Sequence, residues 1–134
     1  MHALILTMAG MHYVLAADGS GALTPVAATE FARDRAFGFG ASRLAEYVEE
    51  KSVARGAGRA TKAEEVHAVT IETIRSGGPE AVAAQMLALP AAGRGAVVVC
   101  DALRPQDMAV VALGMMLAEQ RGAFRRYSGD LGEI

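Results

Sequence analysis

The alternation of apolar runs and helical patterns between residues 66 and 126 predicts the fold class. Val66–Ile71 predicts a strand, and the uninterrupted apolar run Ala96–Cys100 predicts a second strand that is buried on both faces. A helical pattern follows each of them, from Gly78 and from Pro105, and proline suits the first helical turn because it has no N–H to leave unpaired. Strands that alternate with helices are typical of a parallel sheet. We therefore expect a three-layer α/β fold with a mainly parallel sheet flanked by helices.

The apolar positions within the helical patterns predict which side chains form the core. Val82, Met86 and Leu89 recur at helical spacing and predict the buried face of the first of these helices. Methionine adapts to irregular spaces, so we interpret the methionines of the last helix as core residues: Met108, Met115 and Met116. Phe124–Tyr127 predicts a closing strand.

The first 60 residues have a less regular pattern. His2–Thr7 and His12–Leu15 predict a short β-hairpin around Ala9-Gly10, and residues 22–40 predict an extended loop. Ser42 is a candidate N-cap for a following helix, and Thr61-Lys62-Ala63-Glu64 has the pattern of a capping box. Neither half would bury enough apolar surface alone. We therefore expect one α/β domain over residues 1–134, with a loop-rich part (1–60) and a regular β-α-β-α-β part (61–134).

Composition narrows the functional classes. The formal net charge of −2 gives no electrostatic reason to expect a nucleic-acid partner. The single cysteine excludes an internal disulfide and fits a reducing compartment. The apolar run Met108–Ala118 is shorter than the roughly 20 residues of a membrane span. We expect a cytoplasmic protein that binds neither nucleic acid nor membrane.

Few residues suggest a role in binding or catalysis, and each of them can instead have a purely structural role. Asp101 follows a predicted strand, where it either faces a ligand or orders the next turn. Asp34 and Ser42 are polar residues in or after the long loop, and they serve either a ligand or turns and caps. Near the C-terminus, the residues that either hold an anion or form a solvated chain end are Arg125, Arg126, Ser128 and Gly129.

The sequence offers no catalytic pair and no metal-binding pattern. His2, His12 and His67 lack the spacing of metal ligands, both with one another and with Cys100. None of these histidines is placed to activate the cysteine, which we interpret as a small buried apolar residue. The Gly-x-Gly pairs do not follow a strand, so they do not form a phosphate-binding loop.

Four segments, taken in order, resemble one family. Thr29–Asp34 resembles its loop "TxFARDPxFP", although Arg35 and Gly38 stand where that loop has prolines. The segment from Ser42 to Lys51 resembles "SxLxxxVEEKT". Ile74–Val82 resembles "LRxGPEAV", and the residues from Val97 to Asp107 resemble "VVVDAxxxxDL". Together these segments resemble the four-carbon acid sugar kinases, which use ATP to phosphorylate acids such as threonate and erythronate. The similarity covers roughly residues 10 to 128.

The resemblance implies a role for the chain and for several of its residues. The chain is similar to the second part of the family's N-terminal, substrate-binding domain, without the upstream "ADDFTGA"-like acidic loop and the downstream glycine-rich ATP domain. The resemblance implies ATP and Mg²⁺ for the full-length family. For this chain alone it implies no cofactor and no catalytic residue. The implied substrate is a small sugar acid, for which the candidate contacts are Arg33, Asp34, Ser42, Asp101, Arg125 and Arg126, with Ser128 and Gly129 on the nucleotide side.

Two functional readings remain open. In the first, the chain is a fragment of a sugar-acid kinase that carries part of the substrate pocket and is inactive alone. In the second, it is a non-catalytic binding or assembly module. An exposed sheet edge readily pairs with another chain. We therefore expect a homodimer, or association with segments that supply the missing strands.

Overall fold

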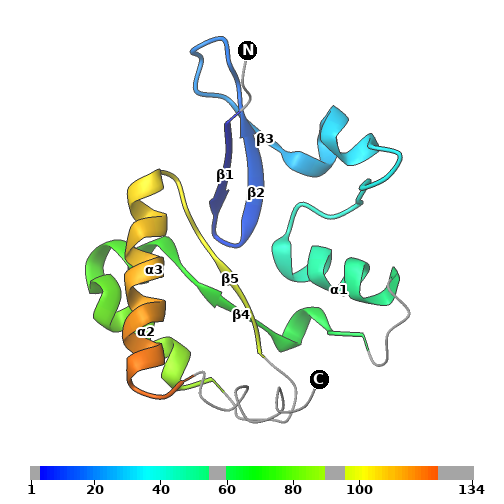
Figure 1. The fold of residues 1–134 in the computed structure, drawn as a ribbon. Coiled ribbons are helices and arrows are strands. Elements are labelled where there is room, and N and C mark those ends of the chain that lie inside the picture. Colours follow the sequence, from blue (N-terminus) through cyan, green and yellow to red (C-terminus); the bar gives the residue numbers. More distant parts are fainter. Residues whose placement is uncertain (1–3, 55–59, 90–95, 124–134) are drawn as a thin grey trace, which may run out of the picture.

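The computed structural model describes residues 4–54, 60–89 and 96–123 and contains two small sheets and three α-helices (Figure 1). The antiparallel sheet has the order β1-β2-β3 and consists of β1 (Leu4–Met8), β2 (Met11–Leu15) and β3 (Leu23–Pro25). The second sheet pairs β4 (Val66–Val69) and β5 (Val97–Cys100) in parallel. The helices are α1 (Leu44–Ala54), α2 (Gly78–Leu87) and α3 (Pro105–Gln120).

The β1–β2 hairpin has the predicted two-residue turn. Met8 pairs with Met11, which leaves Ala9 and Gly10 at the tip. Their φ values are 52° and 70°, and positive φ at both central positions is characteristic of a type I′ turn. Ala9 is unusual there, because a residue with a Cβ adopts this conformation at some cost. Further contacts must therefore hold the turn.

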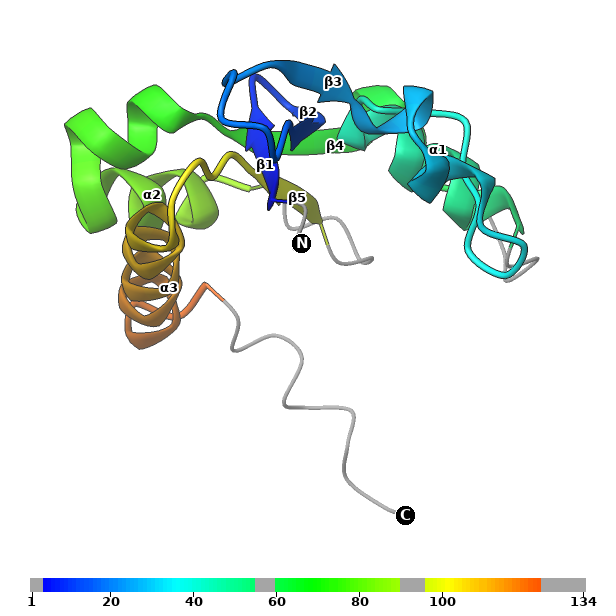
Figure 2. The same ribbon diagram turned by 90° about the horizontal axis from the view of Figure 1, so that it is seen from above.

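The hairpin is joined to the parallel sheet at the carboxyl end of β5. The N–H of Thr7 donates to the carbonyl of Ala102 at 2.9 Å, and the N–H of Ala102 donates back at 3.0 Å. Seen from above, the hairpin lies beside β4 and β5 (Figure 2). The edge of the parallel sheet where ligands usually bind is thus next to the hairpin turn.

The core lies between the parallel sheet and the pair α2–α3, which run side by side in both views (Figures 1 and 2). Val82 and Met86 are buried and Leu89 packs against them, so the predicted buried face of α2 is confirmed. The buried residues of this core cluster are Val69, Ile74, Val82, Ala83, Met86, Val111 and Ala118.

Gly114 sets how closely α3 approaches α2. A Cβ at this position would lie 2.5 Å from the Cβ and Cγ1 of Val82 and 3.0 Å from the carbonyl oxygen of Pro79. These distances leave no room for a methyl group. Sequence reasoning did not use this glycine, although a glycine inside an apolar helix is a recognisable sign of close packing.

We expect Gly114→Ala to destabilise the protein by about 1 kcal/mol. Overpacking costs roughly 1–3 kcal/mol, while the better helix propensity of alanine returns about 1 kcal/mol. Urea denaturation measures the difference. Ala109→Gly, at an exposed position of the same helix, measures the propensity term alone. A stabilising Gly114→Ala would show that the two helices can separate without loss.

Three predictions about individual elements are corrected by the structure. Residues 22–40 are not one extended loop, because they contain β3 and two short 3₁₀ turns, Val26–Ala28 and Glu30–Arg33. Helical structure after β4 begins at Ile71, before the predicted start, and includes a π-helical turn over Thr73–Gly77. The residues of β5 are only partly buried.

The methionines of α3 are also placed differently from the prediction. Met108, Met115 and Met116 are 48%, 44% and 58% exposed, so they are not core residues. The side of α3 that packs on α2 instead carries the smaller residues Val111, Gly114 and Ala118.

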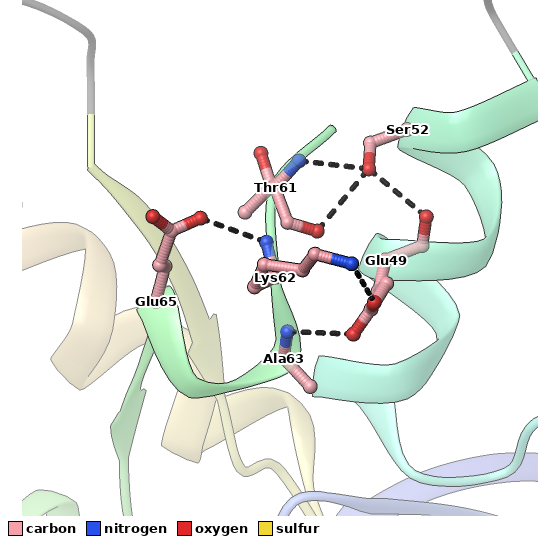
Figure 3. Close-up of polar contacts among 6 residues, drawn as sticks. All are labelled: Glu49, Ser52, Thr61, Lys62, Ala63 and Glu65. Carbon is pink, nitrogen blue, oxygen red and sulfur yellow. Dashed lines mark hydrogen bonds and ion pairs between the residues drawn. The ribbon is translucent and has the colours of Figure 1, made fainter. Parts of the chain in front are cut away.

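Polar contacts connect α1 to the segment that leads into β4 (Figure 3). The carboxylate of Glu49 accepts the N–H of Ala63 at 2.9 Å and pairs with the ammonium group of Lys62 at 2.9 Å. The hydroxyl of Ser52 accepts the N–H of Thr61 at 3.0 Å. These contacts hold the start of the parallel sheet against α1.

Half of the predicted capping box is present, one residue later than expected. The N–H of Lys62 donates to the carboxylate of Glu65 at 2.8 Å, before a single 3₁₀ turn over Ala63–Glu65. Thr61 is engaged by Ser52, so it does not take the capping position.

The α/β class is confirmed, with a parallel pair of strands and a small antiparallel sheet. The three-layer arrangement, the predominance of parallel strands and the division at residue 60 stay predictions. The strand predicted over Phe124–Tyr127 lies outside the described residues. No helix in the described ranges is long and apolar enough to cross a membrane.

Candidate functional site

Asp101 is buried at the carboxyl end of β5 and binds two distant parts of the chain. Its Oδ1 accepts the N–H of Gly10 at 2.9 Å, and its Oδ2 accepts the N–H groups of Ala9 at 3.0 Å and Ile71 at 3.1 Å. One carboxylate thus fixes both the hairpin turn and Ile71, the second residue after β4. These three donors already occupy most of the hydrogen-bonding capacity of the carboxylate, so its observed role is to order turns.

Thr7 and His12 form a polar pair beside this turn. They face each other across the hairpin, and Thr7 Oγ1 lies 2.7 Å from His12 Nδ1. Burial lowers the pKa of His12, which favours the neutral imidazole. A neutral imidazole offers one donor and one acceptor, which suits contact with a hydroxyl. Sequence reasoning considered His12 only as a metal ligand or as a group to activate Cys100, although a tight turn at Ala9-Gly10 places it opposite Thr7.

Ser42 connects the start of α1 to the same hairpin. Its carbonyl accepts the N–H of His12 at 2.9 Å, and the N–H of Leu44 donates to the carbonyl of Gly10 at 2.8 Å. The hydroxyl of Ser42 accepts the N–H of Ala27 at 2.9 Å. It therefore fixes the preceding loop and does not cap α1, contrary to the prediction. Two of the predicted site residues, Ser42 and Asp101, thus both bind the hairpin.

Asp107 fixes the segment that follows Asp101. Its buried carboxylate forms two hydrogen bonds with the guanidinium of Arg75, at 2.9 and 3.0 Å. It also accepts the N–H groups of Leu103 at 2.9 Å and Arg104 at 3.0 Å. The hydrogen bonds from Arg75, followed by those from the two N–H groups, lower the pKa of Asp107 to about 2. The carboxylate is therefore charged at neutral pH.

Arg33 and Asp34 lie on the loop between β3 and α1. The carboxylate of Asp34 accepts the N–H groups of Phe37 at 2.7 Å and Ala36 at 2.8 Å, and these bonds lower its pKa. Arg33 and Arg35 are exposed, and neither guanidinium contacts a partner among the described residues. Sequence reasoning missed Arg35, because it stands where the resembled family has proline.

Contacts with α1 hold this loop in place. Lys51 donates from Nζ to the carbonyl of Gly38, and the N–H of Gly40 donates to Glu50 at 2.9 Å. The ring of Phe39 packs edge-on against Tyr47, with the ring centroids 5.6 Å apart. The two exposed arginines therefore lie on a fixed loop.

Gly38 is required by the path of this loop. A Cβ at Gly38 would lie 2.5 Å from the carbonyl oxygen of Asp34 and 2.9 Å from that of Ala32. No larger residue fits without moving the backbone that carries Arg33 and Arg35.

The remaining candidates are four residues near the C-terminus, a metal site and Cys100. Arg125, Arg126, Ser128 and Gly129 lie outside the described residues. Among the described residues, no group of three or more His, Cys, Asp or Glu side chains is arranged to hold a metal ion. Burial, with a smaller contribution from Asp101, raises the pKa of the Cys100 thiol, which favours its protonated form.

A hollow of about 240 Å³ lies where β4 and β5 meet α2. Its lining is mostly apolar and includes none of the predicted site residues: His67, Ala68, Val69, Gln85, Met86, Ala88, Leu89 and Val98. The hollow is therefore separate from the polar residues around the hairpin turn and from the loop that carries Arg33 and Arg35.

Comparison with known proteins identifies the family. Searches of the curated proteins and of the solved structures give no significant match. The model of the sugar-binding N-terminal domain matches residues 6–131, which is nearly the whole chain. The match includes the turn of the hairpin, the loop that carries Arg33 and Arg35, and both strands of the parallel sheet. This match agrees with the resemblance to the substrate-binding domain of a sugar kinase family. The chain therefore belongs to the sugar-binding N-terminal domain family.

Proposed function

We propose that the domain binds a small sugar acid as the substrate-binding part of a four-carbon acid sugar kinase. The supporting observation is the pair of exposed guanidinium groups of Arg33 and Arg35, which have no partner in the described part of the chain and lie on a loop that α1 holds in place. A guanidinium group matches a carboxylate in a planar, two-bond geometry. A fixed loop also loses little conformational entropy when the acid binds.

The proposal gives the loop and the hairpin different tasks. Arg33 and Arg35 bind the carboxylate of the acid, and Asp34 keeps the loop in shape through Ala36 and Phe37. At the hairpin, the neutral imidazole of His12 offers hydrogen bonds to the hydroxyl groups of the sugar. In this proposal ATP and Mg²⁺ are bound by other parts of the kinase, so this chain alone transfers no phosphoryl group.

The binding test compares acids with the matching neutral polyols. We expect threonate or erythronate, but not threitol or erythritol, to release heat on titration into the full chain. Replacing Arg33 or Arg35 by glutamine should weaken acid binding at least about tenfold, because hydrogen bonds between charged groups contribute about 1.5–3 kcal/mol. Arg121→Gln, at an exposed arginine that follows α3, is the matched control and should not change it.

Two outcomes would contradict the proposal. Equal binding of acids and polyols would show that the carboxylate is not recognised. Unchanged acid binding in both arginine variants would place the site elsewhere. A separate assay of ATP consumption with threonate or erythronate tests the second part of the proposal, and turnover by this chain alone would refute it.

A further inference from the structure

One side of α3 is apolar and uncovered among the described residues. Met108, Met115 and Met116 are all about half exposed, and with Ala112 they recur at helical spacing. We call these four residues the Met strip. They form a side of α3 distinct from the one that carries Val111, Gly114 and Ala118, which pack on α2. A helix that is apolar on all sides is normally buried on all sides.

The two ends of the Met strip carry opposite charges. Arg104 directly precedes α3, and Glu119 lies in its last turn. Neither side chain has an ion-pair partner among the described residues. Both charges also oppose the helix macrodipole, which favours acidic groups at the N-terminus and basic groups at the C-terminus. The arrangement therefore costs the single chain some stability.

A second, antiparallel copy of α3 would give both charges an ion-pair partner and would cover the Met strip. Reversing the helix direction brings Arg104 next to Glu119 of the partner subunit and Met108 next to the partner's Met116. The two-fold axis then passes near Ala112, whose small side chain allows the helices to approach closely. The charge pattern of the strip is complementary to itself only in this orientation.

We propose that two copies of the chain associate through antiparallel packing of their Met strips. Each α3 has 16 residues, so the contact is about 24 Å long. One helix from each copy buries less than the roughly 1,600 Å² of a standard interface. The dimer is therefore expected to be weak and to dissociate on dilution.

Charge reversal tests the orientation directly. Sedimentation velocity of the full chain over a wide concentration range should show a monomer–dimer equilibrium. Arg104→Glu and Glu119→Arg should each weaken the homodimer at least about tenfold, because each places two pairs of like charges in contact. An equimolar mixture of these two variants should dimerise again, because every contact between them then joins opposite charges.

The design separates assembly from folding. Both reversals place charges that the helix macrodipole favours, so neither should destabilise the single chain. Glu64→Lys, at an exposed residue before β4, is the matched control and should leave the equilibrium unchanged. Met116→Glu should also weaken the dimer, and circular dichroism checks that it folds.

Several results would overturn the proposal. A chain that stays monomeric at every concentration would refute it, as would a mixture of the two charge variants that remains monomeric. A dimer that all three α3 variants leave unchanged would place the interface elsewhere, with the sheet edge expected from the sequence as the next surface to test.

Discussion

Replacing Asp101 by alanine should lower the free energy of unfolding by about 3 kcal/mol. Three backbone N–H groups, those of Ala9, Gly10 and Ile71, would lose their acceptor together. An unsatisfied buried donor costs about 1–3 kcal/mol, and partial access of water at the turn keeps the total below the sum of three. The type I′ turn also loses the contact that holds Ala9 at positive φ. Urea denaturation followed by circular dichroism measures the change.

Asp18 provides the control for this prediction. Its exposed carboxylate accepts one N–H, from Ser20, so Asp18→Ala should change stability little. Combining the stability measurement with the sugar-acid titration distinguishes the two roles considered for Asp101. An Asp101→Ala protein that is as stable as Asp18→Ala but no longer binds the acid would show that Asp101 serves the ligand and not the turn.

Local signals in the sequence predicted the hairpin turn and the start of α3, but not β3. The Ala9-Gly10 turn follows from the two short apolar runs on either side of it, and the start of α3 follows from Pro105. The strand β3 was missed because it has three residues and ends in Pro25, at the edge of the sheet. So short a strand is defined by its pairing with β2 and has no periodicity of its own.

Contacts between distant residues could not be predicted in the same way. Asp101 binds Gly10 and Ala9 across 91 and 92 positions, and nothing local marks these residues as partners. The sequence did predict that Asp101 follows a strand. The hydrogen bonds that Asp101 accepts from the hairpin turn depend on how the antiparallel sheet packs beside the parallel sheet.

The exposed methionines show where hydrophobic patterning fails. Apolar residues occur on every side of α3, so periodicity does not indicate which side is buried. Close packing determines which side is buried. Gly114 leaves space for Val82 of α2, whereas the larger Met115 and Met116 stay exposed to solvent. The glycine was the only local sign of that choice.

Asp107→Asn should lower the free energy of unfolding by about 2 kcal/mol at neutral pH. The substitution removes the charge that pairs with Arg75. If the remaining oxygen keeps the N–H groups of Leu103 and Arg104, an amide NH₂ replaces the oxygen that accepts the Nε–H of Arg75. The pKa of Asp107 is about 2 in the folded protein, against 3.8 as the ordinary value. A difference of this size corresponds to about 2 kcal/mol that depends on the ionised carboxylate.

The pH dependence follows from the direction of this pKa difference. Because folding lowers the pKa, the unfolded chain takes up a proton first as the pH falls. The stabilisation from Asp107 is therefore complete above the unfolded value of 3.8 and is lost as the pH falls towards about 2. A protonated carboxyl group resembles an amide in shape and charge, so the difference between the parent protein and Asp107→Asn should shrink over the same range.

An exposed ion pair of similar geometry provides the matched control. Arg121 donates two hydrogen bonds to Glu80, at 2.8 and 3.0 Å, but the carboxylate of Glu80 is largely exposed. Exposed ion pairs contribute little, so Glu80→Gln should change stability much less than Asp107→Asn. Urea denaturation of the three proteins at neutral pH and at successively lower pH measures both effects. An Asp107→Asn deficit that persists undiminished below the folded pKa would show that the lost stability comes from packing and not from the carboxylate charge.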